Sequence, residues 1–587
     1  MGTISDKLMR IINTKEDIRQ ALISKGCDVP TSIPFKEYAK MILDLPCNAD
    51  SFPDIEGIVA RYSASGLTNE QMAANSVWAD ETGNGRDLQL KNFSWKRMSG
   101  VGGYVQDFND FRNNATVDKI RIDEQGSNSI KVTILTTGIG NAIYIPKNIY
   151  QFNKSYFIKI SSEGYDEGDM ALSFYAPSTS TATTVTVSLN PNGITEIPAI
   201  KEDDFLAVYI NVSGKVGSFT VEQLPFYPGA LVFDGVDDYG VCENFPILTK
   251  EKGYTVVVLR QWDQDFLNTT LTGGLLSTRN YSTGEGVAFE KIESSNKGYW
   301  NLGAGGIIYF AKSPFTWQTS KQYNNVGILK GDKNHGKPLC VGCGLSGGQQ
   351  CGRFAIWELV FLDHDATEEE LTKIKDYFVK TYPWLFPDQA WTVVGKTNED
   401  EDRATIANIT GNGNDLVLSN FGFAEGSGYN EEGEYAGYLV TDGVDDKITS
   451  SIFKMGNDWT VIGDWELINT GKNDNAGIVK FDSIVIYNYN YDYNSVLINI
   501  KNGRNILIPD QNTVNAICSD GRIYSKDWKE SIYNEETEST SKKFLTIGYS
   551  GNAYTKIAFK NLAIYPTVLS REDCIKAYNY LQTLKAK

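Results

Sequence analysis

The chain of 587 residues contains one short sequence motif in two nearly identical copies. LVFDGVDD and LVTDGVDD agree at seven of eight positions, and two longer phrases also recur in both halves. The paired phrases lie at 82–93 and 410–421, at 231–238 and 439–446, and at 353–378 and 556–581. Three phrases in the same order indicate a tandem duplication of one domain, and this duplication limits the possible folds more than any other feature.

The spacing of the phrases shows where the two copies differ. Thr82 and Asp234 are 152 residues apart, whereas the matching Thr410 and Asp442 are only 32 apart. Downstream of the Asp residues the two spacings are nearly equal. The first copy therefore contains about 120 extra residues, which is a common domain size. Insertion into a surface loop is tolerated because loop closure costs little, so we predict an inserted domain at 104–227.

The sequence pattern predicts a mostly β protein. Alternating and β-branched runs separated by Gly, Asn, Ser and Pro fill the insert, and both repeats are also rich in strand-forming residues. One helix closes each repeat. Thr367 is the expected N-cap of the first helix, with Glu370 completing a capping box, and Ser570 and Asp573 take these places in the second.

The first residues differ from the rest of the chain, because their apolar positions recur at helical spacing. This pattern predicts three short helices, and three short helices bury little apolar surface by themselves. We therefore expect this segment to associate with copies of itself or with another protein. The predicted domains are a helical attachment module at 1–48, a discontinuous first sandwich at 49–103 plus 228–386, an inserted β-sandwich at 104–227, and a second sandwich at 387–587.

The phrases FDGVDDY, GNGRDLQL and ATEEEL resemble those of the concanavalin A-like, laminin G-like jelly-roll superfamily. The resemblance covers both repeats, about 400 residues. The N-terminal stretch KEDIRQALISKGCDVPTSIPFKEYAKMI resembles a small module in tail and fibre proteins of phages, especially phages of Bacteroidetes hosts. The resemblance implies tandem jelly rolls that serve as rigid binding or spacer modules.

This resemblance also implies a function. We expect a non-enzymatic component of a phage virion appendage, such as a tail fibre, that contacts a host-surface glycan. Other virion proteins would bind the N-terminal helices, and a homo-oligomer, by family resemblance a trimer, is expected. The protein would be made in the bacterial host cytoplasm and reside in the virion. The alternatives are a head fibre or decoration protein without a receptor role, and a capsule polysaccharide depolymerase.

Charge and composition exclude several classes of partner. The net charge of −18 argues against nucleic acid, because no basic stripe offsets it. No apolar run is long enough to span a membrane, and no targeting signal is expected at the N-terminus. The eight cysteines are sparse and irregularly spaced, so we expect reduced thiols. No cofactor is predicted.

The repeated acidic phrase is a candidate calcium site, with Asp234 and Asp237 in the first copy and Asp442 and Asp445 in the second. The adjacent Asp residues of each phrase could add further oxygens. Calcium needs six to eight oxygen ligands on a loop that wraps the ion. Asp-Gly is also a strong tight-turn signal. We therefore favour a hairpin turn with solvated acids.

A second candidate is a zinc set of His335, Cys340, Cys343 and Cys351. The duplication argues against it, because LCVGCG at 339–344 matches LTIGYS in the second copy. A strand also places residues three apart on opposite faces. The expectation is therefore buried strand thiols without a metal.

Catalytic residues are not predicted. Related jelly-roll hydrolases place two carboxylates in a Glu-x-Asp-x-x-Glu pattern, which this sequence lacks. The two histidines, His335 and His364, leave few options for a Ser-His-Asp set.

The stretch YNYNYDYN supplies the candidate glycan contacts. Tyrosines at a spacing of two lie on one face of a strand, and tyrosine rings can stack against sugars. The alternative is packing against a neighbouring sheet or subunit, since tyrosine is a favoured strand residue. The four residues are Tyr487, Tyr489, Tyr491 and Tyr493.

Overall fold

The protein is described here from a computed structural model. The described residues run from 52 to 586. Those not described within this span are 115–117, 176–184, 202–205, 249–252, 268, 270, 272, 279–287, 292–297, 302–306, 310–325, 331–337, 346–348, 411, 425, 434, 452, 455, 469–476, 482–483, 489–495, 501–503, 509–513, 526–527, 529, 533–541, 544, 548 and 551–552. The predicted helical module at 1–48 therefore lies outside the described residues.

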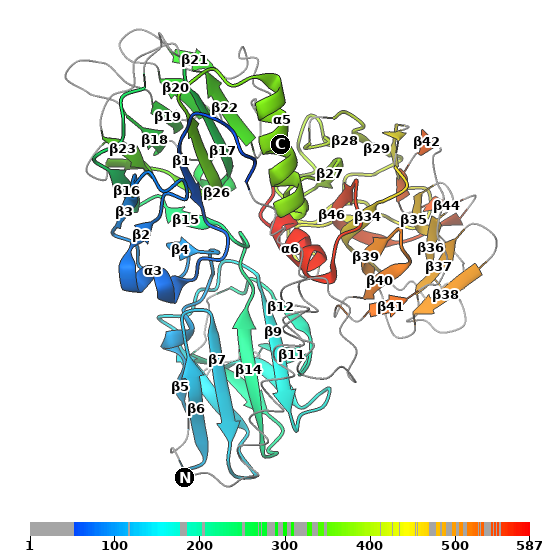
Figure 1. The fold of residues 1–587 in the computed structure, drawn as a ribbon. Coiled ribbons are helices and arrows are strands. Elements are labelled where there is room, and N and C mark those ends of the chain that lie inside the picture. The colour runs from blue at the N-terminus through cyan, green and yellow to red at the C-terminus, as the bar shows by residue number, and fades with distance from the viewer. Residues whose placement is uncertain are drawn as a thin grey trace, which may run out of the picture. The chain divides into compact units, whose positions relative to one another are not determined.

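The first repeat is a sandwich of two mainly antiparallel sheets (Figure 1). One sheet has the order β22-β17-β26-β15-β4, with β1 also paired to β26. Its strands are β1 (Ile58–Ser63), β4 (Gly100–Val101), β15 (Leu231–Asp234), β17 (Thr255–Trp262), β22 (Val326–Lys330) and β26 (Arg353–Leu362). Strands β17 and β26 are buried almost throughout, as expected for a strand at the centre of a sandwich.

The facing sheet has the order β2-β3-β16-β23-β18-β19-β20-β21, with β24 and β25 added beside β18. Its strands are β2 (Val77–Trp78), β3 (Leu88–Lys91), β16 (Tyr239–Cys242), β18 (Gly273–Ser277), β19 (Ala288–Lys291), β20 (Gly298–Asn301), β21 (Ile307–Tyr309), β23 (Leu339–Val341), β24 (Cys343–Leu345) and β25 (Gln349–Cys351). The short helices α3 (Asn69–Asn75) and α4 (Gln264–Leu267) lie in its connections. Side chains of both sheets form one core, which includes Trp78, Phe233 and Phe361.

The second repeat has the same topology in the strands that the two copies share, and β40 and β41 extend its sheet beyond β39. The order β30-β31-β46-β34-β39 corresponds to β4-β15-β26-β17-β22, and β27 pairs with β46 as β1 does with β26. The strands of this sheet are β27 (Gln389–Thr392), β30 (Gly428–Tyr429), β31 (Leu439–Val440), β34 (Thr460–Leu467), β39 (Val514–Cys518), β40 (Arg522–Ser525), β41 (Glu530–Ile532) and β46 (Ile557–Tyr565).

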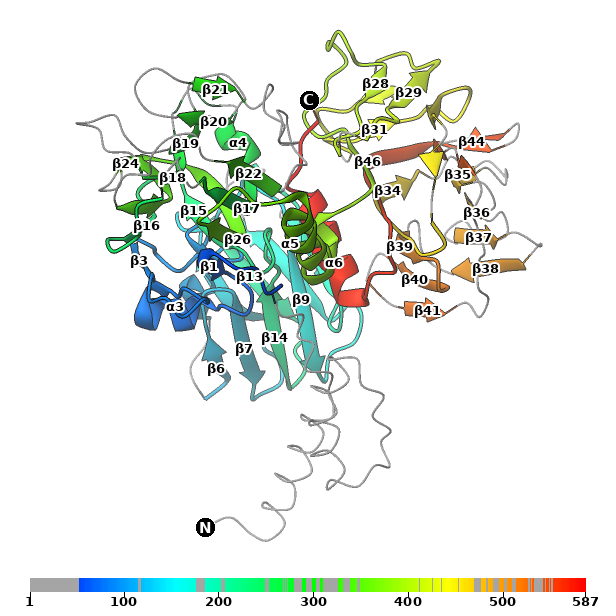
Figure 2. The same ribbon diagram turned by 45° about the horizontal axis from the view of Figure 1, so that its top comes forward.

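Its facing sheet runs β28-β29-β32-β43-β35-β36-β37-β38, and Figure 2 shows β35 to β38 in succession. These strands are β28 (Thr405–Ile406), β29 (Leu416–Ser419), β32 (Lys447–Ser450), β35 (Gly477–Phe481), β36 (Ile484–Asn488), β37 (Val496–Ile500), β38 (Arg504–Ile508) and β43 (Leu545–Ile547). Two small ribbons pair β33 (Phe453–Lys454) with β42 (Lys542–Lys543) and β44 (Tyr549–Ser550) with β45 (Ala553–Tyr554).

Strand irregularities are duplicated along with the strands. The ladder between β17 and β26 shifts register between Leu259 and Arg260, and the ladder between β34 and β46 shifts at the corresponding Asp464 and Trp465. A β-bulge leaves one residue of a strand unpaired and bends the strand. The shared positions show that the two sandwiches have the same curvature built in at the same place.

Residues 104–227 contain a sandwich of two five-stranded sheets, in the orders β11-β10-β13-β8-β5 and β12-β9-β14-β7-β6. The strands are β5 (Arg112–Asn113), β6 (Ile120–Gln125), β7 (Ser129–Ile134), β8 (Asn141–Pro146), β9 (Tyr156–Glu163), β10 (Met170–Tyr175), β11 (Val185–Leu189), β12 (Ile194–Ile197), β13 (Ala207–Val212) and β14 (Gly217–Gln223). A separate core, with Ile145, Phe174 and Val221, fills this sandwich. A 3-10 turn, Phe108–Asp110, precedes β5.

The helix that closes each repeat begins as predicted. Helix α5 (Glu368–Thr381) has Thr367 as N-cap, and the capping box with Glu370 is confirmed. Together with described residues before Gly57, α5 belongs to a compact unit separate from the sheets. In the second repeat, Ser570 caps α6 (Arg571–Leu581) and accepts from the N–H of Asp573. A 3-10 turn, Pro383–Leu385, leads into the second repeat, and its Trp384 ring lies 4.4 Å from the Lys576 ammonium of α6.

The entry and exit of the inserted sandwich are paired, which suggests a test of its independence. The N–H groups of Phe226 and Tyr227 donate to the carbonyls of Gly103 and Gly102 at 3.0 and 2.9 Å. We predict that deleting 104–227 and joining Gly103 to Pro228 leaves a first repeat that still melts cooperatively, because its core and sheets lie outside the deleted segment. Calorimetry of the deletion variant and of the full chain checks this. Loss of the cooperative transition of the first repeat would contradict it.

Candidate functional site

The repeated acidic phrase carries the chain from one sheet of each sandwich to the other. Strand β15 belongs to the sheet of β26, whereas β16, which follows the phrase, pairs with β3 and β23. The predicted hairpin is therefore wrong, since the two strands flanking the turn do not pair with each other. We call residues 234–238 and 442–446 the crossing turns.

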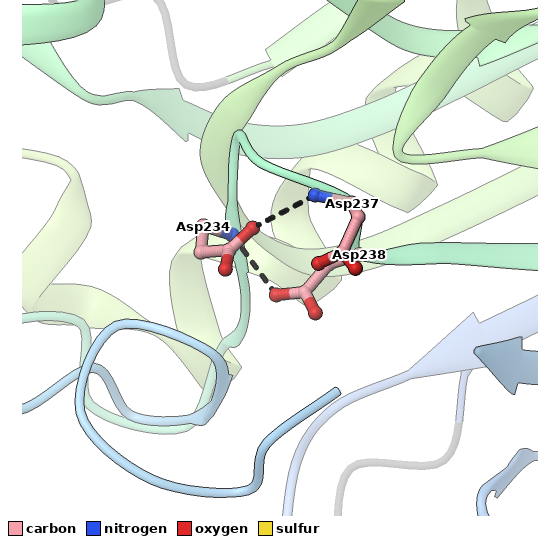
Figure 3. Close-up of side chains that lie close together, drawn as sticks. All are labelled: Asp234, Asp237 and Asp238. Atoms are coloured by element: carbon pink, nitrogen blue, oxygen red, sulfur yellow. Dashed lines mark hydrogen bonds between the residues drawn. The ribbon is translucent and has the colours of Figure 1, made fainter. Parts of the chain in front are cut away.

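Hydrogen bonds within the crossing turn define its shape (Figure 3). The Asp234 carboxylate accepts from the N–H groups of Val236 and Asp237 at 2.7 and 3.4 Å. The Asp238 carboxylate accepts from the N–H of Asp234 at 3.0 Å and from the Ser99 hydroxyl at 3.0 Å. Asp234 is half-buried and Asp237 exposed, but Asp238 is fully buried. The expectation of solvated acids is therefore wrong for Asp238.

The second crossing turn repeats the hydrogen bonds that lie within the turn. Asp442 accepts from the N–H groups of Val444 and Asp445 at 2.7 and 3.2 Å, and the buried Asp446 accepts from the N–H of Asp442 at 2.8 Å. In both copies an Asn side chain reaches the middle of the turn. Asn92 donates to the carbonyl of Asp237, and Asn420 donates to that of Asp445, each at 3.0 Å.

Burial changes the acidity of the innermost carboxyl group of each turn. It raises the pKa of Asp238 to about 7, and the charge of Asp234 adds to this effect. Burial also raises the pKa of Asp446, to about 6. An ordinary Asp has a pKa of about 4. The folded protein therefore binds a proton at these positions more tightly than the unfolded chain does.

These shifts predict how stability depends on pH. Because the native pKa of Asp238 is raised, its contribution is fully present below about pH 4 and is lost as the pH rises through about 7. The substitution Asp238→Asn keeps the size and an acceptor oxygen but cannot ionise. We expect the free energy of unfolding of the wild-type protein to fall by up to a few kcal/mol across this window relative to the variant.

Denaturant unfolding of both proteins between about pH 4 and about pH 8 measures this difference. Asp237→Asn, at the exposed neighbour in the same turn, is the matched control and should change the pH slope far less, because the Asp237 charge contributes less to the raised pKa of Asp238 than burial and the Asp234 charge do. An Asp238→Asn variant with the wild-type slope would contradict the prediction.

Hydrogen bonds from the protein already use some of the carboxylate oxygens that a calcium ion would need in the acidic clusters. Among the described residues, Asp234, Asp237 and Asp238 bring carboxylate oxygens within 4.8 Å of one another, and the three acids of the second turn do the same. In the first copy, three of these six oxygens already accept from protein donors. Calcium takes six to eight oxygens. We interpret both clusters as hydrogen-bonded turns.

The thiols of the first repeat lie closer together than strand periodicity predicts. Gly342, at φ +100°, interrupts the chain between β23 and β24, so the rule that residues three apart lie on opposite faces does not apply across it. The Cys340 and Cys343 sulfurs are 2.7 Å apart, and both join Cys351 in one buried cluster. The prediction of opposite faces is wrong, and the prediction of buried thiols is confirmed. His335 lies outside the described residues.

Metal content tests both candidate sets in one protein sample. We expect elemental analysis of the full chain to show no stoichiometric zinc, because the three described sulfurs of the zinc set do not all lie within 4.8 Å of one another and its thiols are buried. We also expect the melting temperature to be the same in calcium and in chelator, since a bound ion would raise it. One tightly held zinc per chain, or a calcium-dependent rise in melting temperature, would contradict this.

Most of the predicted tyrosine row lies outside the described residues. Tyr487 belongs to β36 and is paired with Leu497 of β37, whereas Tyr489, Tyr491 and Tyr493 are not described. The contact of this row with sugars stays a prediction. His364 lies in the turn after β26, where its carbonyl accepts from the Thr255 hydroxyl at 2.9 Å.

A pocket of about 410 Å³ with both apolar and polar side chains in its lining lies beside the first crossing turn, and no sequence pattern indicates it. Its volume is within the range of small-ligand sites. The segment after β3 and the segment before β9 line it, together with the crossing turn itself and Arg353 of β26. Residues that carry its polar groups include Ser94, Lys96, Gln151, Asn153, Lys154 and Arg353. Hydroxyl, amide and cationic groups here can donate several hydrogen bonds to one ligand.

The cations of this pocket are balanced by nearby acids. Lys96 lies 3.2 Å from Asp107, and Lys154 lies 3.6 Å from Asp265. Arg97 lies 3.2 Å from Asp110, and Arg353 lies 3.9 Å from Asp263. The pocket therefore combines apolar surface with polar side chains and has no large excess of positive charge, which suits a neutral, hydroxyl-rich ligand at least as well as an anion.

No family model matches the sequence, and no curated protein matches it. Solved structures with some likeness include the receptor binding domain of botulinum neurotoxin type G, at 13% identity and a TM-score of 0.21, covering 33% of this chain and 50% of that one. This chain thus spans about half the length of that domain. The ligand binding domain of botulinum neurotoxin serotype D, solved with N-acetylneuraminic acid, has 10% identity and a TM-score of 0.22, covering 62% and 94%.

The sialidase of Trypanosoma rangeli, solved with sialic acid, has 8% identity and a TM-score of 0.23, covering 78% of this chain and 83% of that one. Such low TM-scores do not identify a shared function. Within the described residues, no helix is long and apolar enough to cross a membrane.

Proposed function

We propose that this protein is a structural and binding component of a phage virion appendage, such as a tail fibre, and that it contacts a host-surface glycan without cutting it. The virion role rests on the resemblance of the N-terminal stretch to a module of phage tail and fibre proteins. The pocket beside the first crossing turn, with its hydrogen-bonding side chains, is the observation that carries the binding role.

The pocket suits a sugar for two reasons. Its amide and cationic side chains can donate to sugar hydroxyls, the Ser94 hydroxyl, which donates to the Lys96 carbonyl, can accept from one, and the volume accommodates one or two sugar units at a typical ligand-site size. The acids nearest to it, by contrast, already have structural partners. Asp234 and Asp238 hold the crossing turn together, which favours binding over hydrolysis.

Binding and cleavage can be tested in one experiment. The full chain is incubated with purified host-surface polysaccharide, and both retention on the polysaccharide and release of reducing ends are measured. We expect weak, saturable binding with no reducing ends. Steady release of reducing ends would favour the depolymerase alternative, and absence of binding would favour a decoration protein without a receptor role.

Variants locate the contact. Asn153→Ala removes an exposed side chain of the pocket and should weaken binding several-fold, since each hydrogen bond contributes about 1 kcal/mol. Lys119→Ala, an exposed change elsewhere in the same inserted sandwich, is the matched control and should have no effect. If only Tyr487→Ala weakens binding, the glycan contacts the tyrosine row instead of the pocket.

A further inference from the structure

Two thiols of the first repeat face each other across a sharp corner of the chain. The Cys340 and Cys343 sulfurs are separated by 2.7 Å, and both residues are almost fully buried. A disulfide bond has a length of about 2.0 Å, so forming one here needs a movement of only ~0.7 Å. The two residues belong to the stretch Cys-Val-Gly-Cys.

The backbone fixes this corner independently of the sulfurs. The Gly342 N–H donates to the carbonyl of Leu275 at 2.7 Å, and its carbonyl accepts from the N–H of Gly352 at 3.0 Å. A Cβ atom at this position would lie 2.6 Å from the carbonyl oxygen of Asp238, so only glycine fits. The bonds to neighbouring strands therefore hold Cys340 and Cys343 in place, and little conformational entropy remains to be lost on forming a bond.

A third thiol lies on the neighbouring strand. Cys351 of β25 is paired with Cys343 of β24, and a hydrogen bond with Cys343 raises the pKa of the Cys351 thiol. The three sulfurs are not among the groups of described ligand atoms that lie within 4.8 Å of one another. Three thiolates around one ion would have to be closer than that. The arrangement therefore favours a bond between two sulfurs over a shared metal.

We propose that Cys340 and Cys343 are a redox modification site and form a disulfide under oxidising conditions, with hydrogen peroxide as the oxidant. One thiolate attacks a peroxide oxygen, which gives a sulfenic acid and releases hydroxide. The second sulfur then attacks the sulfenic sulfur, the S–O bond breaks, and water leaves. Overall, two thiols and one peroxide give one disulfide and two waters. A small neutral oxidant is required because the sulfurs are buried.

The full chain can be tested as it is. Protein purified in reductant is exposed to hydrogen peroxide, denatured in N-ethylmaleimide to block the remaining thiols, digested and analysed by mass spectrometry. We expect Cys340 and Cys343 to be linked in most molecules, and the link to disappear on treatment with dithiothreitol. The proposal is overturned if most molecules carry N-ethylmaleimide on both Cys340 and Cys343. It is also overturned if Cys343 is linked mainly to another cysteine.

Two variants make the test specific. Cys343→Ser should lose the link, whereas Cys242→Ser should retain it. Cys242 is a matched control because it is also buried and lies on the adjacent strand β16, but its sulfur contacts Asn244 at 3.1 Å and it is not part of the thiol cluster. If a variant fails to fold, the mapping of the wild-type chain still decides the proposal. None of these readouts depends on glycan binding, so the two proposals can fail separately.

Discussion

In both sandwiches, the hydrogen bond that a buried carboxyl group accepts inside the crossing turn sets the path of the chain from one sheet to the other. Asp238 accepts a hydrogen bond from the N–H of Asp234, four residues before it in the chain. It accepts a second one from the hydroxyl of Ser99, which directly precedes β4. These two bonds fix the point at which the chain passes from one sheet to the other. Hydrogen bonds to a charged group are worth about 1.5–3 kcal/mol each, and here they also select the direction in which β16 begins.

The charged form of Asp238 is electrostatically unfavourable at this position. An acid with a pKa near neutrality is partly protonated in the folded state, because burial and a neighbouring acid both oppose its charge. The same cost recurs at Asp446. Since both copies retain it, the geometry of the crossing is the feature that the acidic phrase serves. This is the physical reason that one chain contains the phrase twice.

Sequence reasoning predicted the features that depend on local pattern. The mostly β fold class is confirmed, and the capping box at Thr367 and the N-cap at Ser570 follow from side chains that satisfy nearby N–H groups. Features that depend on distant strands were mispredicted. Asp-Gly indicates a tight turn, but whether its flanking strands pair is decided by β3 and β23, which are far away in sequence.

The prediction that Cys340 and Cys343 lie on opposite faces of a strand was wrong for a related reason. Strand periodicity assumes extended backbone, and the left-handed conformation of Gly342 breaks it between Cys340 and Cys343. Nothing in a short window of sequence distinguishes this glycine from one inside a regular strand. The pocket beside the first crossing turn could not be predicted either, because its walls come from segments that are up to about 260 residues apart in the chain.

Comparison of the two copies separates what the fold requires from what each copy has added. Glu358 of β26 is fully buried and accepts two hydrogen bonds from Arg61, whereas the corresponding Asn561 of β46 instead donates to the Gln582 side chain. Cys340 and Cys343 correspond to Thr546 and Tyr549. The topology and the crossing turns are shared, but these polar and reactive groups are not.

The inserted sandwich extends this difference to the surface. Ser94 and Lys96 lie in the segment after β3, and the matching segment after β29 in the second copy continues directly to β30 and β31 with no inserted domain. In the first copy the insert adds Gln151, Asn153 and Lys154 opposite that segment, and together they line the pocket. The duplication thus accounts for two sandwiches of the same topology. The polar side chains at 151–154, which line the pocket, belong to the inserted domain, and the second copy has no such insert.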